Sequence, residues 1–93
     1  MVIVNYVFNT IASPRKHKEV LTLLKNIGKE IYISVRSDTK AINHEKWTYL
    51  GLYEGWLTSA NTFQRFYDGE MIYRYFGQVQ YISDNSSFKL FKV

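Results

Sequence analysis

Cysteine is absent from the 93-residue chain, and proline occurs only once, as Pro14. Without thiols the chain forms neither a disulfide nor a thiolate metal site, and a reducing cytoplasm is compatible with its composition. No apolar run is long enough to span a membrane. The apolar N-terminal stretch, residues 1–11, is interrupted by Asn5 and Asn9 and lacks both a basic leader and a cleavage pattern, so we expect a strand rather than a signal peptide.

A dense basic tract is also lacking, although the formal net charge is +4 and the isoelectric point is about 9.4. The positive charge is spread along the sequence, over Arg15 to Lys18, Lys25, Lys29, Lys40, Lys89 and Lys92. Such a spread is typical of a solvated surface. We therefore do not expect a nucleic-acid partner.

Aromatic side chains are abundant: eight Tyr, six Phe and two Trp make up 17% of the residues, and hydrophobic residues make up 46%. This composition excludes an intrinsically disordered chain. A chain of this length forms one domain, residues 1–93, and buries only roughly 60–65% of the surface that its unfolded form exposes. The aromatic surface is therefore expected to fill a core, line a cavity or be covered by a second subunit.

The first half of the chain predicts two strands and a helix. Alternation over 2–10 and over 31–36 is typical of strands. Between them, Ser13 and Pro14 form a helix start, apolar residues recur at helical spacing, and Gly28 is placed to end the helix, which is predicted over 14–27. The polar residues 37–46 are expected to form a long hairpin connection.

The second half predicts two more strands and a broken helix. An aromatic strand is expected over 47–56, paired with the preceding strand. Thr58 or Ser59 is predicted to cap a helix with Phe63, Phe66 and Tyr67 on its inner face. A break at residues 68–69, a further helical stretch over 70–76, a turn over 84–87 and a last strand over 88–93 complete the prediction.

The element order predicts an α+β, ferredoxin-like βαββαβ fold with a four-stranded antiparallel sheet and helices on one face. Both faces of the strands over 2–10 and 47–56 carry large apolar groups, whereas a sheet half exposed to water alternates apolar with charged residues. We therefore expect the open sheet face to be covered.

Three segments resemble the antibiotic-biosynthesis-monooxygenase-like family of dimeric α/β barrels. They are the N-terminal strand VIVNYVFNT, the helix that begins at Pro14, and the segment LYEGWLTSANTFQRF, where a Glu and an aromatic lead into a Ser/Thr-capped helix. The resemblance implies a homodimer joined through the open sheet faces, with a pocket between the sheet and helices of each subunit. It also implies cofactor-independent oxygen chemistry on a small aromatic molecule of the quinol or polyphenol type.

The chain departs from this family in its histidines. Many members, including the haem-degrading ones, have a His in or after the second helix, but this chain has only His17 and His44. Phe66 and Phe76 stand where a haem-degrading member would have Trp and His. Without an imidazole there, haem breakdown is not expected. Neither His has a neighbouring ligand at metal-binding spacing, so we expect no metal, and the resemblance to cofactor-independent oxygenases implies no cofactor.

Two polar residues are candidates for catalysis. Asn5 and Tyr67 could each donate a hydrogen bond that steadies developing negative charge, although an Asn satisfied by backbone or water is the simpler interpretation. Glu54 could accept a proton if buried, or could pair with a basic residue of a dimer partner. Four aromatics could line a flat substrate pocket, or could simply form core: Trp56, Phe63, Phe66 and Tyr73.

The alternative function is a non-catalytic binding module for a small ligand or a nucleic acid on the same fold. Aromatics on the strands over 2–10 and 47–56 could stack on bases, as in RNA-recognition domains. The chain lacks the basic, Gly-containing strand typical of that class. The small-ligand version of this hypothesis does not depend on that signature.

Overall fold

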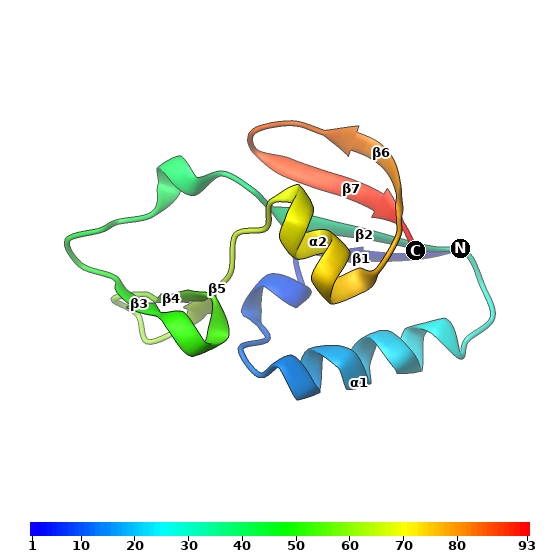
Figure 1. Ribbon diagram of the computed structural model, residues 1–93, viewed down its shortest axis with the longest axis horizontal. Helices are drawn as coiled ribbons and strands as arrows, with labels where there is room; N and C mark the ends of the chain where they lie inside the picture. The colour runs from blue at the N-terminus through cyan, green and yellow to red at the C-terminus, as the bar shows by residue number, and fades with distance from the viewer.

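The computed structural model describes all residues 1–93 and has an α+β fold with two helices and two sheets (Figure 1). The strands of the main sheet are β1 (Val2–Asn5), β2 (Ile31–Arg36), β6 (Gln80–Asp84) and β7 (Phe88–Lys92). The helices are α1 (Pro14–Lys25) and α2 (Gly69–Phe76). The small sheet consists of β3 (Thr48–Leu50), β4 (Gly55–Leu57) and β5 (Phe63–Gln64). Three short 3₁₀ turns complete the fold: η1 (Phe8–Thr10), η2 (Thr39–Ala41) and η3 (Gly51–Tyr53).

The main sheet has the strand order β1-β2-β7-β6. Helix α1 connects β1 to β2, which lie parallel and in register from Val2 opposite Ile31 to Asn5 opposite Ser34. The pairs β2–β7 and β7–β6 are antiparallel. Both chain ends lie beside the start of β2, because Val2 N donates to the Glu30 carbonyl and Val93 N donates to the Ile31 carbonyl. Neither helix has the length and apolar character needed to cross a membrane.

Capping residues explain where the two helices begin. Ser13 Oγ accepts a hydrogen bond from Lys16 N at 3.2 Å, and Pro14 occupies the first helical position, as predicted. Asp68 Oδ1 likewise accepts from Met71 N at 2.8 Å at the start of α2. Gly28 has the positive φ of 73° that the chain needs to leave α1. The predicted helices over 14–27 and 70–76 and the strands over 31–36 and 88–93 are therefore confirmed to within two residues.

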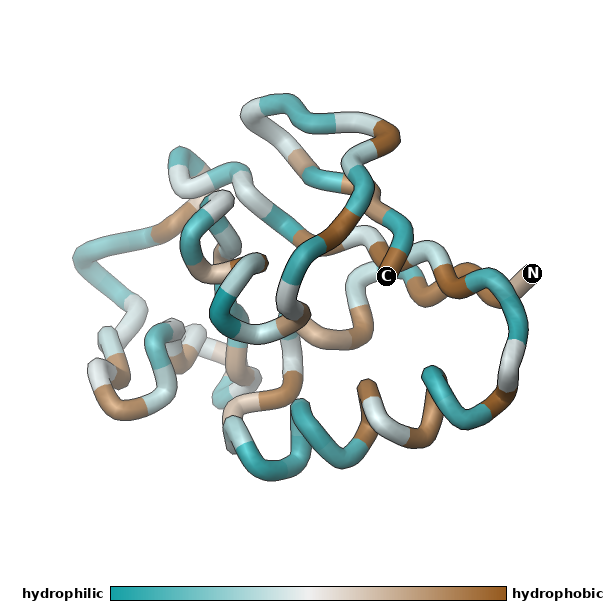
Figure 2. The backbone as a smooth tube through the Cα atoms, turned by 45° about the vertical axis from the view of Figure 1, so that its right-hand side comes forward, coloured by the Kyte–Doolittle hydropathy of each residue, from teal (hydrophilic) through white to brown (hydrophobic).

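The core lies between the main sheet and the two helices. Along α1, hydrophobic and hydrophilic residues alternate from turn to turn (Figure 2). His17 and Leu21 are the buried residues of this helix. Nine buried hydrophobic residues form one cluster: Phe8, Leu21, Ile31, Ile33, Val35, Tyr67, Ile72, Phe76 and Phe91. Three of these residues come from β2, in which four of the six residues are buried. The opposite face of the sheet, with Ile3, Asn5, Tyr32 and Ser34, carries no helix.

The sheet pairing differs from the ferredoxin-like prediction of four antiparallel strands. The sheet is mixed, because β1 pairs directly with β2 in parallel. The predicted aromatic strand over 47–56 does not join this sheet. It is interrupted by η3, and its two halves, β3 and β4, pair with each other in the small sheet. Since no strand from this segment enters the main sheet, the β6–β7 hairpin occupies the other side of β2.

Two further local predictions are wrong. No helix begins at Thr58 or Ser59: Thr58 and Thr62 close a turn through their side-chain oxygens, 2.7 Å apart, and the following residues form β5. Asn61 in this turn has a φ of 60°, which a helix does not allow. Strand β6 was not predicted, although its partner β7 and the turn between them were. The predicted first strand, residues 2–10, ends at Asn5 because Tyr6 adopts a left-handed conformation.

Candidate binding site

A cleft of about 560 Å³ opens between α1, α2 and the turn η3. The side of α1 that faces it carries Pro14, His17, Lys18, Leu21, Thr22 and Lys25. Leu52 and Glu54 contribute from η3, and Arg74, Tyr75 and Phe76 contribute from α2. The cleft is therefore built from three segments that are far apart in the sequence. Its walls combine charged side chains at the rim with aromatic and aliphatic groups at the floor.

Beneath the floor lies a buried polar network of His17, Tyr67 and Arg65, each at most 1% exposed. The Tyr67 hydroxyl is 3.0 Å from His17 Nε2 and 3.2 Å from the Phe8 carbonyl oxygen. It also accepts a hydrogen bond from Arg65 Nη1 at 3.2 Å. No buried side-chain nitrogen or oxygen lacks a partner. The network therefore holds α1, the segment after β5 and the start of η1 in one fixed arrangement.

Arg65 is a buried cation that forms no ion pair, although its charge acts on the Glu54 carboxylate from a greater distance. Its guanidinium donates to three backbone carbonyls, those of Ile11 at 2.8 Å, Ala12 at 2.9 Å and Tyr53 at 2.6 Å. Its Cζ atom also lies 4.6 Å from the centre of the Tyr75 ring and 5.0 Å from that of Phe63. These carbonyl dipoles and ring faces stabilise the charge without cancelling it. The positive potential of Arg65 therefore reaches the cleft through Tyr75.

This environment changes the protonation of its neighbours. Burial, together with the positive charge of Arg65, lowers the pKa of His17 from 6.5 to about 4. Burial raises the pKa of Tyr67 to about 12, and it also raises the pKa of Tyr75. His17 is thus a neutral imidazole at pH 7, and both tyrosines keep their hydroxyl protons. None of the three is ionised near neutral pH.

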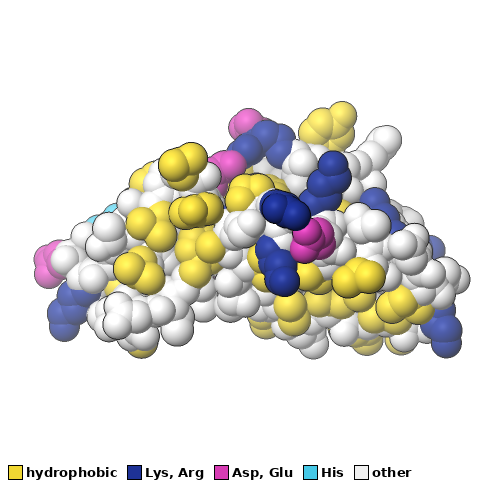
Figure 3. Space-filling view, turned by 90° about the horizontal axis from the view of Figure 1, so that it is seen from below, with side chains coloured by type: hydrophobic (Ala, Val, Ile, Leu, Met, Phe, Trp, Pro, Cys, Tyr) yellow, Lys and Arg dark blue, Asp and Glu magenta, His cyan; other side chains and the backbone are white.

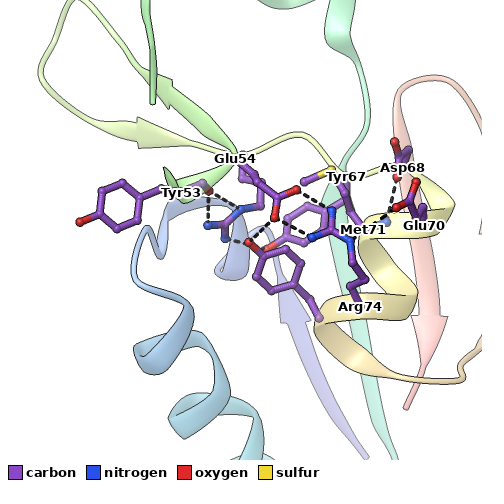
Figure 4. Close-up of polar contacts among 9 residues, drawn as sticks. Tyr53, Glu54, Tyr67, Asp68, Glu70, Met71 and Arg74 are labelled. Atoms are coloured by element: carbon purple, nitrogen blue, oxygen red, sulfur yellow. Dashed lines mark hydrogen bonds and ion pairs between the residues drawn. The ribbon is translucent and has the colours of Figure 1, made fainter. Parts of the chain in front are cut away.

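Glu54 and Arg74 form the ion pair at the rim of the cleft (Figure 4). Arg74 donates from Nη1 and Nη2 to the two Glu54 oxygens at 2.7 and 2.5 Å, a bidentate geometry. These hydrogen bonds lower the pKa of Glu54. Glu54 has a φ of 51°, a left-handed conformation that is uncommon for a residue other than glycine. The pair joins η3 to α2, so Glu54 binds a cation of its own chain.

The structure separates the two residues predicted to act in catalysis. Asn5 is exposed on the sheet face without helices, where its Oδ1 accepts a hydrogen bond from Ser34 Oγ at 2.8 Å. Tyr67 is 1% exposed on the other side of the sheet, within the core. The two side chains therefore do not face a common pocket.

The four predicted pocket aromatics are also dispersed. Trp56 and Phe63 belong to the small sheet, where the Trp56 ring lies 5.0 Å from that of Tyr49. Phe66 is buried beside Trp47 and under the Arg36 guanidinium, 4.8 Å from its ring centre. Tyr73 is 67% exposed on the outer side of α2. None of these four residues lines the cleft between α1 and α2.

Sequence reasoning missed Arg65 and the part played by His17. His17 stands among Arg15, Lys16 and Lys18 in the sequence, yet its position three residues after Pro14 and four before Leu21 puts it on the inner side of α1. Arg65 stands between aromatic residues in the segment FQRFY, a local pattern compatible with burial. No group of three or more His, Cys, Asp or Glu side chains is arranged to hold a metal ion.

Comparisons with known proteins do not assign a function to the cleft, so its interpretation depends on the residues described above. No protein-family description matches the chain, and neither a curated protein nor a solved structure is significantly similar to it.

Proposed function

We propose that the protein is a binding module that holds a small organic anion in the cleft between α1, α2 and η3. The observation that carries this proposal is the excess of positive charge in and under the cleft. Lys18 and Lys25 face it and form no ion pair, and the buried Arg65 lies behind its floor. The only carboxylate at the cleft, that of Glu54, is already bound to Arg74.

The lining offers complementary contacts for such a ligand. Lys18 and Lys25 lie seven residues apart on α1, about 10 Å along the helix, so their ammonium groups can flank a bound carboxylate or phosphate. The half-buried Tyr75 ring and Leu52 can contact the apolar part of the ligand. Small-molecule sites are usually lined mainly by apolar groups, whereas most residues that line this cleft are polar or charged, which suits a charged ligand.

Binding without catalysis is favoured by the state of the titratable groups. A general base needs an accessible acceptor atom near the reacting proton. His17 is 1% exposed and its Nε2 already contacts the Tyr67 hydroxyl. Glu54 accepts hydrogen bonds from Arg74, which stabilise its charge and make it a weak base. The cleft therefore presents cations and hydroxyl donors rather than an activated nucleophile or base.

Titration with benzoate and citrate, followed by backbone amide NMR signals, tests the proposal. Saturable shifts are expected at Lys18, Thr22 and Tyr75, and benzamide, which has the ring but no charge, is expected to give none. The double variant Lys18→Gln/Lys25→Gln should weaken binding at least about tenfold because two charged contacts are lost. The variant Lys40→Gln/Lys46→Gln has the same net charge and should bind as the natural protein does. Equal weakening in both variants, or no saturable shifts, would contradict the proposal.

The cofactor-independent oxygenase hypothesis stays a prediction. It requires a pocket that orients a flat aromatic substrate and supplies a hydrogen bond to the developing anion. Oxygen consumption with a panel of quinols, compared between the natural protein and Tyr67→Phe, measures it directly. The homodimer through the open sheet face stays a prediction as well, and light scattering on a size-exclusion column measures the mass that decides it.

A further inference from the structure

The net charge of the protein is concentrated in one segment, residues 15–29. This segment contains five of the twelve Lys and Arg residues, Arg15, Lys16, Lys18, Lys25 and Lys29, but only one of the eight acidic residues, Glu19. The remaining seven cations are matched by seven acidic residues, so the rest of the chain is neutral. The segment consists of α1 and the turn that follows it. The whole excess of +4 therefore belongs to α1 and its C-terminal turn.

Ion pairing increases this contrast. Outside α1, Arg36, Arg74, Lys89 and Lys92 each contact a carboxylate. On α1 only Arg15 does so, through an Nε contact of 3.3 Å to Glu19 in which the Arg15 side chain is 90% exposed. Such an exposed pair is weak and yields readily to a competing anion. The other four cations of the segment form no ion pair.

Three of these cations form a row beside the cleft. Arg15, Lys18 and Lys25 lie three and seven residues apart, so they share one side of α1 and extend over about 15 Å along the helix axis. Lys18 and Lys25 line the cleft, and a shallower hollow continues from it past Arg15 and Thr22. Seen from the α1 side, Lys and Arg side chains gather at the middle of the molecule around one acidic side chain (Figure 3). One small anion cannot contact a row of this length.

We propose that the natural ligand of the cleft is part of a single-stranded nucleic acid, whose successive phosphates follow the row while one base enters the cleft. This inference rests on the proposed function and extends it from a small anion to a polyanion. A basic groove with an aromatic side chain for base stacking is the usual arrangement in proteins that bind single strands. Here the row supplies the groove, and the half-buried Tyr75, whose ring also contacts the Arg65 guanidinium and the His17 imidazole, is an aromatic side chain of the cleft lining.

A single strand fits these observations better than an anionic membrane. Membrane-surface helices combine their cations with a broad apolar face that enters the bilayer. On α1 the only exposed large apolar side chain is Leu23, which lies beside Arg15 and Lys18 at the shallower hollow, so the helix has no broad apolar face to enter a bilayer. A nucleic acid was not expected from the sequence because the cations were counted along the whole chain. The charge balance of the remaining residues and the ion pairs of four cations outside α1 single out α1.

Fluorescence anisotropy with a labelled oligouridylate of about 12 nucleotides tests the inference. If Arg15, Lys18 and Lys25 each neutralise a phosphate, the logarithm of the association constant should fall with the logarithm of salt concentration with a slope of about −2. Lys18→Gln/Lys25→Gln should reduce this slope to about −0.7 and weaken binding at least about tenfold at low salt. Lys40→Gln/Lys46→Gln, with the same net charge, should leave both quantities unchanged. Tyr75→Leu should weaken binding without changing the slope, because it removes stacking and no charge.

The outcomes separate this inference from the proposed function. Oligonucleotide binding that both double variants weaken equally would overturn the inference, since it would depend only on net charge. No oligonucleotide binding, with saturable benzoate or citrate shifts still present, would overturn the inference and leave the small-anion site. Binding to vesicles that contain phosphatidylserine, with none to the oligonucleotide, would overturn it in favour of a membrane surface. Loss of both oligonucleotide and small-anion binding would overturn both proposals.

Discussion

The two sheets of this protein are stabilised by different kinds of contact. The main sheet packs against α1 and α2 through nine buried hydrophobic residues, and four of the six residues of β2 are buried. In the small sheet only Gly55 is buried, and neighbouring apolar side chains are exposed, by 55% in Tyr49 and 88% in Leu52. The small sheet therefore has almost no core of its own.

Polar contacts to the main layer, which consists of the main sheet and the helices α1 and α2, compensate for this missing core. Arg65 follows β5 directly, and its guanidinium reaches the Tyr53 carbonyl on one side and the Ile11 and Ala12 carbonyls on the other. Its backbone N–H also donates to the Asn9 carbonyl at 2.8 Å. One buried cation thus joins both parts of the fold and contributes its charge to the cleft. The comparison indicates that the residue that joins the two sheets is also the buried cation on which the proposed anion site depends.

Replacement of Arg65 should have the largest effect. Arg65→Met leaves the Ile11, Ala12 and Tyr53 carbonyls without their donors in a buried position, which should lower the free energy of unfolding by about 3–5 kcal/mol. Arg65→Lys, which keeps the charge and loses the planar fork, should lower it less. Urea denaturation followed by fluorescence and circular dichroism measures both values.

Arg74→Met provides the matched comparison, because the Arg74 guanidinium also forms several hydrogen bonds but its side chain is 46% exposed. Arg74→Met should lower the free energy of unfolding by no more than about 1 kcal/mol. If the two Met variants were equally stable, Arg65 would not be the contact that joins the two parts of the fold.

Acidification should lower the stability of the protein through His17, which is buried in the main layer. Its pKa is about 4 in the folded protein and near 6.5 when unfolded, so the unfolded chain takes up the proton first. The buried, neutral His17 therefore makes the free energy of unfolding depend on pH. Stability is highest above pH 6.5, and the free energy of unfolding falls by about 3 kcal/mol as the pH falls towards 4. His17→Gln should show a flatter dependence in this range. A dependence in His17→Gln as steep as that of the natural protein would contradict the role of His17.

Local sequence signals predicted both helices and the strands β2 and β7 of the main sheet, although they missed β6 and extended β1 too far. The Ser13–Pro14 start, the helical spacing along α1 and the alternation in 31–36 each depend on neighbouring residues, and the structure confirms all three. The turn over 84–87 is confirmed too, since Asn85 Oδ1 accepts hydrogen bonds from the N–H groups of Ser87 and Phe88. Signals of this kind act over a few residues and do not depend on the rest of the fold.

Pairing and burial could not be predicted in the same way. The segment 47–56 has the composition of a central strand, but η3 and the left-handed Glu54 bend it back onto itself, and it leaves the main sheet. Arg65 is buried because carbonyls 12 and 53–54 residues away accept its hydrogen bonds. Neither feature leaves a periodic pattern in the sequence. The candidate cleft was missed for the same reason, since its three walls meet only after the chain has folded.

Gly55→Ala, a variant with a small expected loss of stability, distinguishes the small sheet from the main layer most directly. A Cβ atom at Gly55 would lie 2.3 Å from the Phe63 ring and 2.9 Å from the Gln64 carbonyl oxygen, so Gly55→Ala must separate β4 from β5. At Gly51 the nearest atom to such a Cβ is 3.7 Å away, in the Tyr49 side chain, so Gly51→Ala is the matched control. Because the small sheet contributes little buried surface, Gly55→Ala should cost only about 1–2 kcal/mol. Hydrogen exchange should accelerate in β3, β4 and β5 while protection in β2 is retained. Equal acceleration in β2 would mean that the two sheets unfold as one cooperative unit.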